Sequence, residues 1–120
     1  MATIHFIDII GPIYQDLLKK CEKRKISVNL DFQDLTLRVP EPEKVEQFLQ
    51  TEVKRALANC DAGDKITLAQ ASSDDVIKIS VKNSGRAPLT DDTKAALRNA
   101  GYEVRSRFGY DTIISMRIVR

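Results

Sequence analysis

The residues best suited to chemistry in this sequence lie close together, at Thr51, Glu52 and Arg55. In a helix, side chains three and four residues apart are neighbours, so these three would share one side. A guanidinium binds carboxylates and phosphates, and a carboxylate can accept a proton or pair with a guanidinium. The alternative is a solvated helix edge on which Glu52 pairs with Arg55.

The position of Glu52 relative to the apolar residues bears on this choice. The apolar stripe of the surrounding helix is formed by Val45, Leu49, Val53, Ala56 and Leu57. On a helical wheel Glu52 falls inside that stripe, whereas Thr51 and Arg55 lie together just outside it. Carboxylates are rarely buried without a partner, so we expect Glu52 to pair with Arg55 or with a residue of the closing strands.

The remaining reactive residues exclude several classes of site. His5 is the only histidine, which rules out histidine-rich metal sites, and its apolar neighbours predict a position on a strand or a sheet edge. Cys21 and Cys60 are too few for a disulfide framework or a zinc cluster. The basic cluster between Lys19 and Lys25 predicts the C-terminal end of a helix, where positive charge suits the helix dipole.

Length and composition describe one domain that spans residues 1–120. Hydrophobic residues make up 42% of the chain, which is enough for a core, and the net charge of +2 gives no reason to expect nucleic acid. No apolar run approaches the roughly 20 residues of a membrane span. The first residues also lack the features of a secretory signal. We therefore expect a cytoplasmic protein without membrane association.

Apolar periodicity predicts three helices and six strands. The expected helices cover residues 11–24, 42–57 and 91–100, with Pro12 and Pro42 at first helical positions and Thr90 as an N-cap. The expected strands cover residues 26–30, 35–39, 66–71, 76–81, 102–107 and 112–119. Neighbouring strands are separated by turns, such as residues 31–34, so hairpins should dominate. The order α-β-β-α-β-β-α-β-β predicts an α/β fold of the α+β type: a two-layer sandwich with a mixed, mostly antiparallel sheet and three helices on one face.

Three segments carry a recognisable order and spacing. They are RALANCDAGDKI at Arg55–Ile66, VIKISVKNSGRAP at Val76–Pro88 and EVRSRFGYDTIISMRI at Glu103–Ile118. These resemble, in turn, the N box, the first glycine box and the closing hairpin of the ATP-binding catalytic domain of sensor histidine kinases. That family belongs to the GHKL, or Bergerat-fold, superfamily. The likeness covers nearly the whole chain and implies a minimal histidine-kinase-type ATPase domain.

The resemblance implies nucleotide contacts at the end of the second helix. Thr51 and Arg55 stand where the N-box asparagines of the family hold Mg²⁺ and phosphates, and Asn59 lies at the end of the same box. Neither Thr51 nor Arg55 offers the neutral carbonyl oxygen that a hard cation prefers. The place of Arg55 in this box implies that its guanidinium could bind the phosphates directly, in place of the metal ion. ATP or ADP is therefore the candidate ligand, Mg²⁺ is in doubt and no metal site is expected. Some relatives use an acidic N-box residue as a base, which admits Glu52 as a catalytic candidate.

The resemblance also implies contacts after the central strand. Asn83 stands where the family has an aspartate that binds the adenine amino group, and its side-chain oxygen can still accept a hydrogen bond. Gly85 keeps the first glycine of this box, whereas Ala87 replaces the second and adds a methyl group. Thr112 occupies a small or polar place in the closing hairpin.

The segment between Gly85 and Gly101 is short for the family, which has an ATP lid and a second glycine box there. These departures predict a degenerate, pseudokinase-like signalling domain with weak or no nucleotide binding. It would act by contact with a protein partner, such as a kinase dimerisation hairpin or a response regulator. The alternative is a functional catalytic domain of a two-component kinase, a transferase that passes phosphate from ATP to a partner's histidine.

Basic residues are frequent near the C-terminus, which raises a second possibility for a partner. They are Arg98, Arg105, Arg107, Arg117 and Arg120. Together with neighbouring aromatic residues they could form a stripe that binds single-stranded nucleic acid. An exposed sheet face, partly neutralised by Glu103 and Asp111, is the interpretation that we favour.

Overall fold

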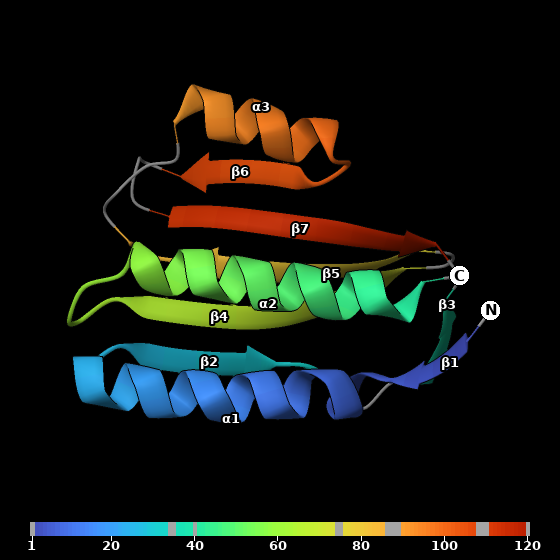
Figure 1. Ribbon diagram of the computed structural model, residues 1–120, viewed down its shortest axis with the longest axis horizontal. Helices are drawn as coiled ribbons and strands as arrows, with labels where there is room; N and C mark the ends of the chain where they lie inside the picture. Colours follow the sequence, from blue (N-terminus) through green and yellow to red (C-terminus); the bar gives the residue numbers. More distant parts are fainter. Residues whose placement is uncertain are drawn as a thin grey trace.

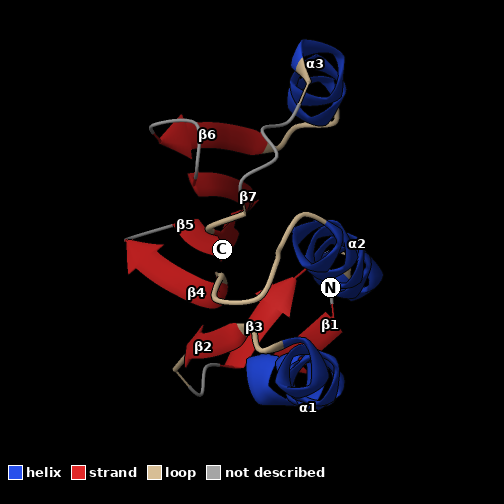
Figure 2. Cartoon of the chain, turned by 90° about the vertical axis from the view of Figure 1, so that its left-hand side faces the viewer, coloured by secondary structure: helices blue, strands red, loops and turns tan. Residues whose placement is uncertain are grey.

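The computed structural model describes residues 2–33, 36–39, 41–73, 76–85, 90–107 and 111–119. Its elements are β1 (Ala2–His5), α1 (Phe6–Arg24), β2 (Ser27–Asp31), β3 (Thr36–Val39), α2 (Pro42–Ala58), β4 (Lys65–Ser73), β5 (Val76–Asn83), α3 (Asp91–Asn99), β6 (Glu103–Arg107) and β7 (Asp111–Val119). Figure 2 shows the three helices on one side of the strands. The α+β two-layer sandwich expected from the sequence is thus confirmed.

The main sheet has five strands in the order β2-β4-β5-β7-β6, seen edge to edge in Figure 1. β2 runs parallel to β4, and the other neighbours pair antiparallel, so the sheet is mixed and mostly antiparallel. β5 is the middle strand, as its apolar composition predicted, and Ile77 and Ile79 are fully buried beneath the helices. Alternation along β5 places every second residue in the core.

The first helix begins earlier than its proline suggested. We expected residues 11–24 with Pro12 at the first helical position, but α1 begins at Phe6 and Pro12 lies inside it. Phe6 and Ile10 are each 1% exposed, so the helix extends its apolar stripe upstream into the core. Burying two large apolar side chains, at about 1.5–3 kcal/mol each, offsets the one backbone hydrogen bond that proline removes.

The expected hairpin around residues 31–34 was wrong. β2 joins the main sheet through β4, whereas β3 pairs antiparallel with β1 in a separate two-stranded sheet. His5 was expected on a strand or a sheet edge, but β1 was not among the six expected strands, because four residues with one buried side chain, Ile4, show no clear periodicity. The hairpins β4–β5 and β6–β7 formed as expected.

The third helix is held mainly by its two ends. Thr90 accepts a hydrogen bond from the backbone N–H of Thr93 at 3.2 Å, which confirms it as the N-cap. At the other end Gly101 has a φ of 91° and donates to the Arg98 carbonyl, while Tyr102 donates to the Leu97 carbonyl. This pair of bonds is a Schellman ending that requires a left-handed residue, which glycine supplies without strain.

α2 is the element that positions the candidate site. Its buried residues are Val45, Phe48, Leu49, Glu52, Val53 and Ala56. One edge of the helix faces α1, and the opposite edge brings Phe48 against Tyr102, with ring centroids 4.9 Å apart. Helical spacing puts Glu52, Arg55 and Asn59 on the same edge as Phe48.

Candidate functional site

The C-terminal end of α2 is tied to the end of α1 by Arg24. Its guanidinium donates to the carbonyl of Leu57 at 2.9 Å and to the carbonyl of Cys60 at 2.6 Å. The last carbonyls of a helix lack intrahelical partners and carry partial negative charge, so a cation fits there. The sequence predicts only that Arg24 lies at the end of its own helix, because nothing in it links residues 24 and 57.

The chain after β5 passes directly against this helix end. Gly85 is buried, and a β-carbon at this position would overlap the carbonyl oxygen of Asn59 and lie 2.8 Å from Nδ2 of Asn83. Only glycine allows the backbone to approach so closely. Gly85, which the sequence singled out for a ligand, therefore also has a packing role in joining β5 to α2.

Two buried polar residues lie beside this junction. Asn83 ends β5 and is paired in register with Thr112 of β7, and each is 6% exposed. The Asn83 side chain acts on the Cys60 thiol and opposes part of the rise in its pKa. Burial and the nearby carboxylate of Asp64 raise the pKa of that thiol, so Cys60 is held in its neutral form.

An ion pair occupies the next turn of α2. Oε2 of Glu52 lies 3.2 Å from Nη1 of Arg55, which confirms the pairing expected from the sequence. The Glu52 side chain is 1% exposed, whereas that of Arg55 is 29% exposed. Burial raises the pKa of the Glu52 carboxyl, and the charge of Arg55 only partly opposes that shift.

The structure thus brings most of the candidate residues to one end of the sandwich. Asn59, Asn83, Gly85 and Thr112 meet where α2, β5 and β7 come together. Glu52 and Arg55 follow along the same edge of α2, whereas Thr51 is exposed at the margin of that edge. Ala87 lies outside the described residues.

Thr51 and Arg55 do not fit Mg²⁺ as ligands. Thr51 offers an exposed hydroxyl, and Arg55 a guanidinium that is already paired with a carboxylate. A cation at Arg55 would meet positive charge, whereas Mg²⁺ favours carboxylate, carbonyl and water oxygens in octahedral geometry. In the described part of the chain no group of three acidic, histidine or cysteine side chains could hold a metal ion.

Other candidate residues have structural roles. His5 is exposed on β1 and its Nδ1 lies 2.9 Å from Oγ1 of Thr36 on β3, consistent with the expected strand histidine. Glu103 bridges two basic residues on the open sheet face, with Lys78 at 2.9 Å and Arg117 at 2.7 Å. This bridging lowers the pKa of the Glu103 carboxyl and partly neutralises the basic stripe considered for nucleic acid.

Comparison with solved structures places this fold in a known class. The fold is that of histidine kinase catalytic domains. The catalytic domain of the histidine kinase ThkA superposes with a TM-score of 0.76 and 17% identity over 99% of this chain and 98% of its own. The histidine kinase AdeS of Acinetobacter baumannii matches with a TM-score of 0.75 and 15% identity over 99% of this chain and 68% of its own.

A third structure shows such a domain in an assembly. ThkA in complex with the response regulator protein TrrA matches with a TM-score of 0.74 and 18% identity, over 98% of this chain and 41% of that chain. Neither a protein-family model nor a curated protein sequence matches the chain. Among the described residues, no helix has both the length and the apolar character to cross a bilayer.

Proposed function

We propose that this chain is a signalling domain of histidine kinase fold that acts through contact with a protein partner. Its nucleotide binding is weak and independent of Mg²⁺, and it does not transfer phosphate. The observation that carries this proposal is the Glu52–Arg55 ion pair at 3.2 Å, which occupies the turn of α2 where metal-binding asparagines are expected from the family resemblance.

The charges in that turn argue against the metal-dependent step. A catalytic base must be available to take a proton, but the Glu52 carboxylate is buried and held by Arg55. Mg²⁺, where a kinase binds it, neutralises the phosphates during transfer. Arg55 could neutralise a phosphate in its place only by giving up its contact with Glu52, which would leave a buried carboxylate without a partner.

A second candidate function is that of an ATP-binding catalytic domain. The residues around Asn83, at the end of the site away from Glu52 and Arg55, favour it. Asn83 carries a side-chain carbonyl oxygen that could accept a hydrogen bond from the adenine amino group. Asn59, Gly85 and Thr112 would complete the walls of that subsite. With the adenine end alone, we expect binding in the high micromolar to millimolar range, about 4–5 kcal/mol.

The partner proposed is a component of a two-component system. The comparison that supports it is the complex between ThkA and its response regulator protein. In this chain, a response regulator or the dimerisation hairpin of a kinase is the proposed partner, and the setting is proposed to be cytoplasmic.

A phosphotransfer assay tests the proposed function. The chain is mixed with a separately folded kinase dimerisation hairpin and radiolabelled ATP, and phosphohistidine on the hairpin is measured with Mg²⁺ present and with a chelator. We expect no phosphohistidine above the level of hairpin alone. Phosphohistidine that requires both Mg²⁺ and this chain would overturn the proposal and establish the catalytic alternative.

A further inference from the structure

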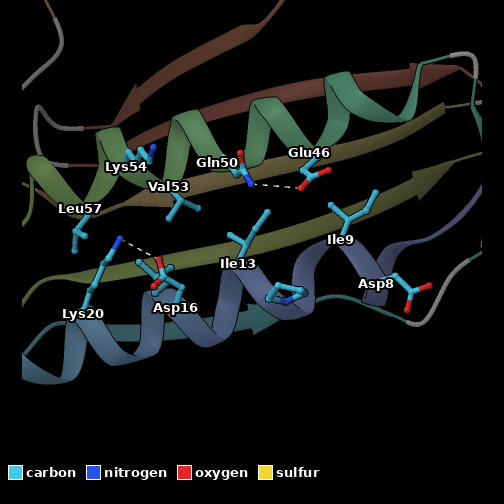
Figure 3. A pocket seen from close by; sticks show the side chains of 12 residues that line it. Asp8, Ile9, Ile13, Asp16, Lys20, Glu46, Gln50, Val53, Lys54 and Leu57 are labelled. Atoms are coloured by element: carbon cyan, nitrogen blue, oxygen red, sulfur yellow. Dashed lines mark hydrogen bonds and ion pairs between the residues drawn. The ribbon is translucent and has the colours of Figure 1, made fainter.

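A groove of about 330 Å³ runs between α1 and α2, on the edge of α2 opposite to Arg55 (Figure 3). Its floor is apolar and is formed by Ile9, Ile13, Leu17, Val53 and Leu57. Ile9, Ile13 and Leu57 pack against the core but stay partly exposed, so the groove offers apolar surface to a partner. No residue of the candidate nucleotide site lines it.

The charges on the rim of the groove are sorted along its length. Asp8 and Glu46 lie near the beginnings of α1 and α2, whereas Lys20 and Lys54 lie near their ends (Figure 3). The two helices run in the same direction (Figure 1), so both rims are acidic at one end and basic at the other. Asp16, which pairs with Lys20 at 2.9 Å, is the one acidic residue toward the basic end.

This sorting fits a helix that runs in the opposite direction. Acidic residues stabilise the beginning of a helix and basic residues its end, so α1 and α2 are themselves stabilised by this pattern. An antiparallel third helix with the same preference would place its acidic first turn at Lys20 and Lys54. Its basic last turn would then meet Asp8 and Glu46. A parallel helix would bring like charges together at both ends.

We propose that the groove between α1 and α2 binds one amphipathic helix of a protein partner, antiparallel to both helices. This rests on the proposed function as an interaction module and names the surface and the kind of partner. From Asp8 to Lys20 the rim is about 18 Å long, which a helix of about 12–14 residues spans. Apolar residues at helical spacing on the partner helix would cover Ile9, Ile13 and Leu57.

The test uses two stapled helical peptides of equal composition. Each has an apolar stripe and a fluorophore, but one carries Glu in its first turn and Lys in its last, and the other has these charges exchanged. Binding is measured by fluorescence anisotropy on the whole chain. A double variant, Lys20→Glu with Lys54→Glu, tests the groove. Lys19→Glu with Lys23→Glu changes the net charge equally on exposed positions outside it.

We expect the unmodified chain to prefer the peptide with the acidic first turn by about tenfold at low salt. The groove variant should lose or reverse this preference, and the control variant should keep it. Because both peptides are compared on each protein, differences in peptide helicity cancel. Amide shifts in nitrogen-15 spectra should centre on Ile9, Ile13 and Leu57.

Other results would overturn the inference. They are equal affinity for the two peptides, no binding of either, or shifts centred elsewhere. Groove shifts that grow when the chain alone is concentrated would assign the groove to a second copy instead. None of these readouts uses ATP or a kinase hairpin. The peptide experiment can therefore disprove helix binding in the groove without affecting the phosphotransfer result. Conversely, phosphotransfer activity would overturn the proposed function even if the peptide preference is observed.

Discussion

Oε2 of Glu52 and Nη1 of Arg55 are 3.2 Å apart, and the two side chains differ sharply in exposure, at 1% and 29%. The carboxylate therefore depends on the arginine, whereas the arginine can also reach water. A buried charge that loses its partner lowers stability strongly, whereas a partly exposed charge that loses its partner does not. The pair is thus asymmetric, and its two ends should respond differently to substitution.

Arg55→Met should destabilise the chain by about 3 kcal/mol at neutral pH, because it leaves the Glu52 carboxylate buried and unpaired. Burial already raises the pKa of that carboxyl. The penalty applies above the folded-state pKa and disappears as the pH falls below it, where the carboxyl is neutral. Urea unfolding of the variant and the unmodified chain at neutral and mildly acidic pH should show that the difference in their free energies of unfolding becomes smaller as the pH falls.

The control for this prediction is the other half of the pair. Glu52→Gln leaves the partly exposed Arg55 as the unpaired charge. The stability of this variant at neutral pH should therefore stay within about 1 kcal/mol of that of the unmodified chain. Glu52→Gln combined with Arg55→Met should recover most of the loss caused by Arg55→Met. If the double variant is no more stable than Arg55→Met alone, the ion pair does not explain the loss.

Gly85→Ala should cost about 2 kcal/mol, because its methyl group would displace the Asn59 carbonyl or the chain after β5. Gly11→Ala is the matched control, since nothing lies within 4 Å of a β-carbon there. Gly11 is inside α1, so alanine should raise stability by up to about 1 kcal/mol. Thermal unfolding of both variants gives the comparison, and equal effects would show that the approach of Gly85 to Asn59 is not tight.

Arg24→Met should lower stability by about 1–2 kcal/mol, because it removes the guanidinium donor from the carbonyls of Leu57 and Cys60 at the end of α2. Hydrogen exchange at the backbone amides of Asn59 and Cys60, which close the last turns of α2, should accelerate more than exchange in β5. Lys23→Met, an exposed neighbour, should change stability by less than about 0.5 kcal/mol. Unchanged exchange at the α2 end in Arg24→Met would contradict this capping role.

Most of the fold could be predicted because its signals are local. The stripe of α2, the alternation of β5, and the roles of Thr90 and Gly101 in bounding α3 each depend on neighbouring residues, and all four are observed. The Glu52–Arg55 pair was predictable for the same reason, since three residues in a helix fix the distance.

The remaining features depend on contacts between distant segments. β3 pairs with β1 and not with β2, and the Arg24 side chain donates to a carbonyl at the end of α2. The sequence contains no local signal for either contact. The close approach of Gly85 to Asn59 arises only when β5 packs beside the end of α2. The sequence names Asn59, Asn83 and Gly85 as candidates but does not show that they meet.

The central claim is that the adenine end of the site remains while its metal end does not. An amide NMR titration with ATP, once with Mg²⁺ and once with a chelator, tests it most directly. We predict weak shifts confined to Asn59, Asn83, Gly85 and Thr112, with the same dependence on ATP in both conditions. The absence of any shift would contradict an adenine-binding end. Binding strengthened about tenfold or more by Mg²⁺, with shifts that extend to Thr51 and Arg55, would contradict the account.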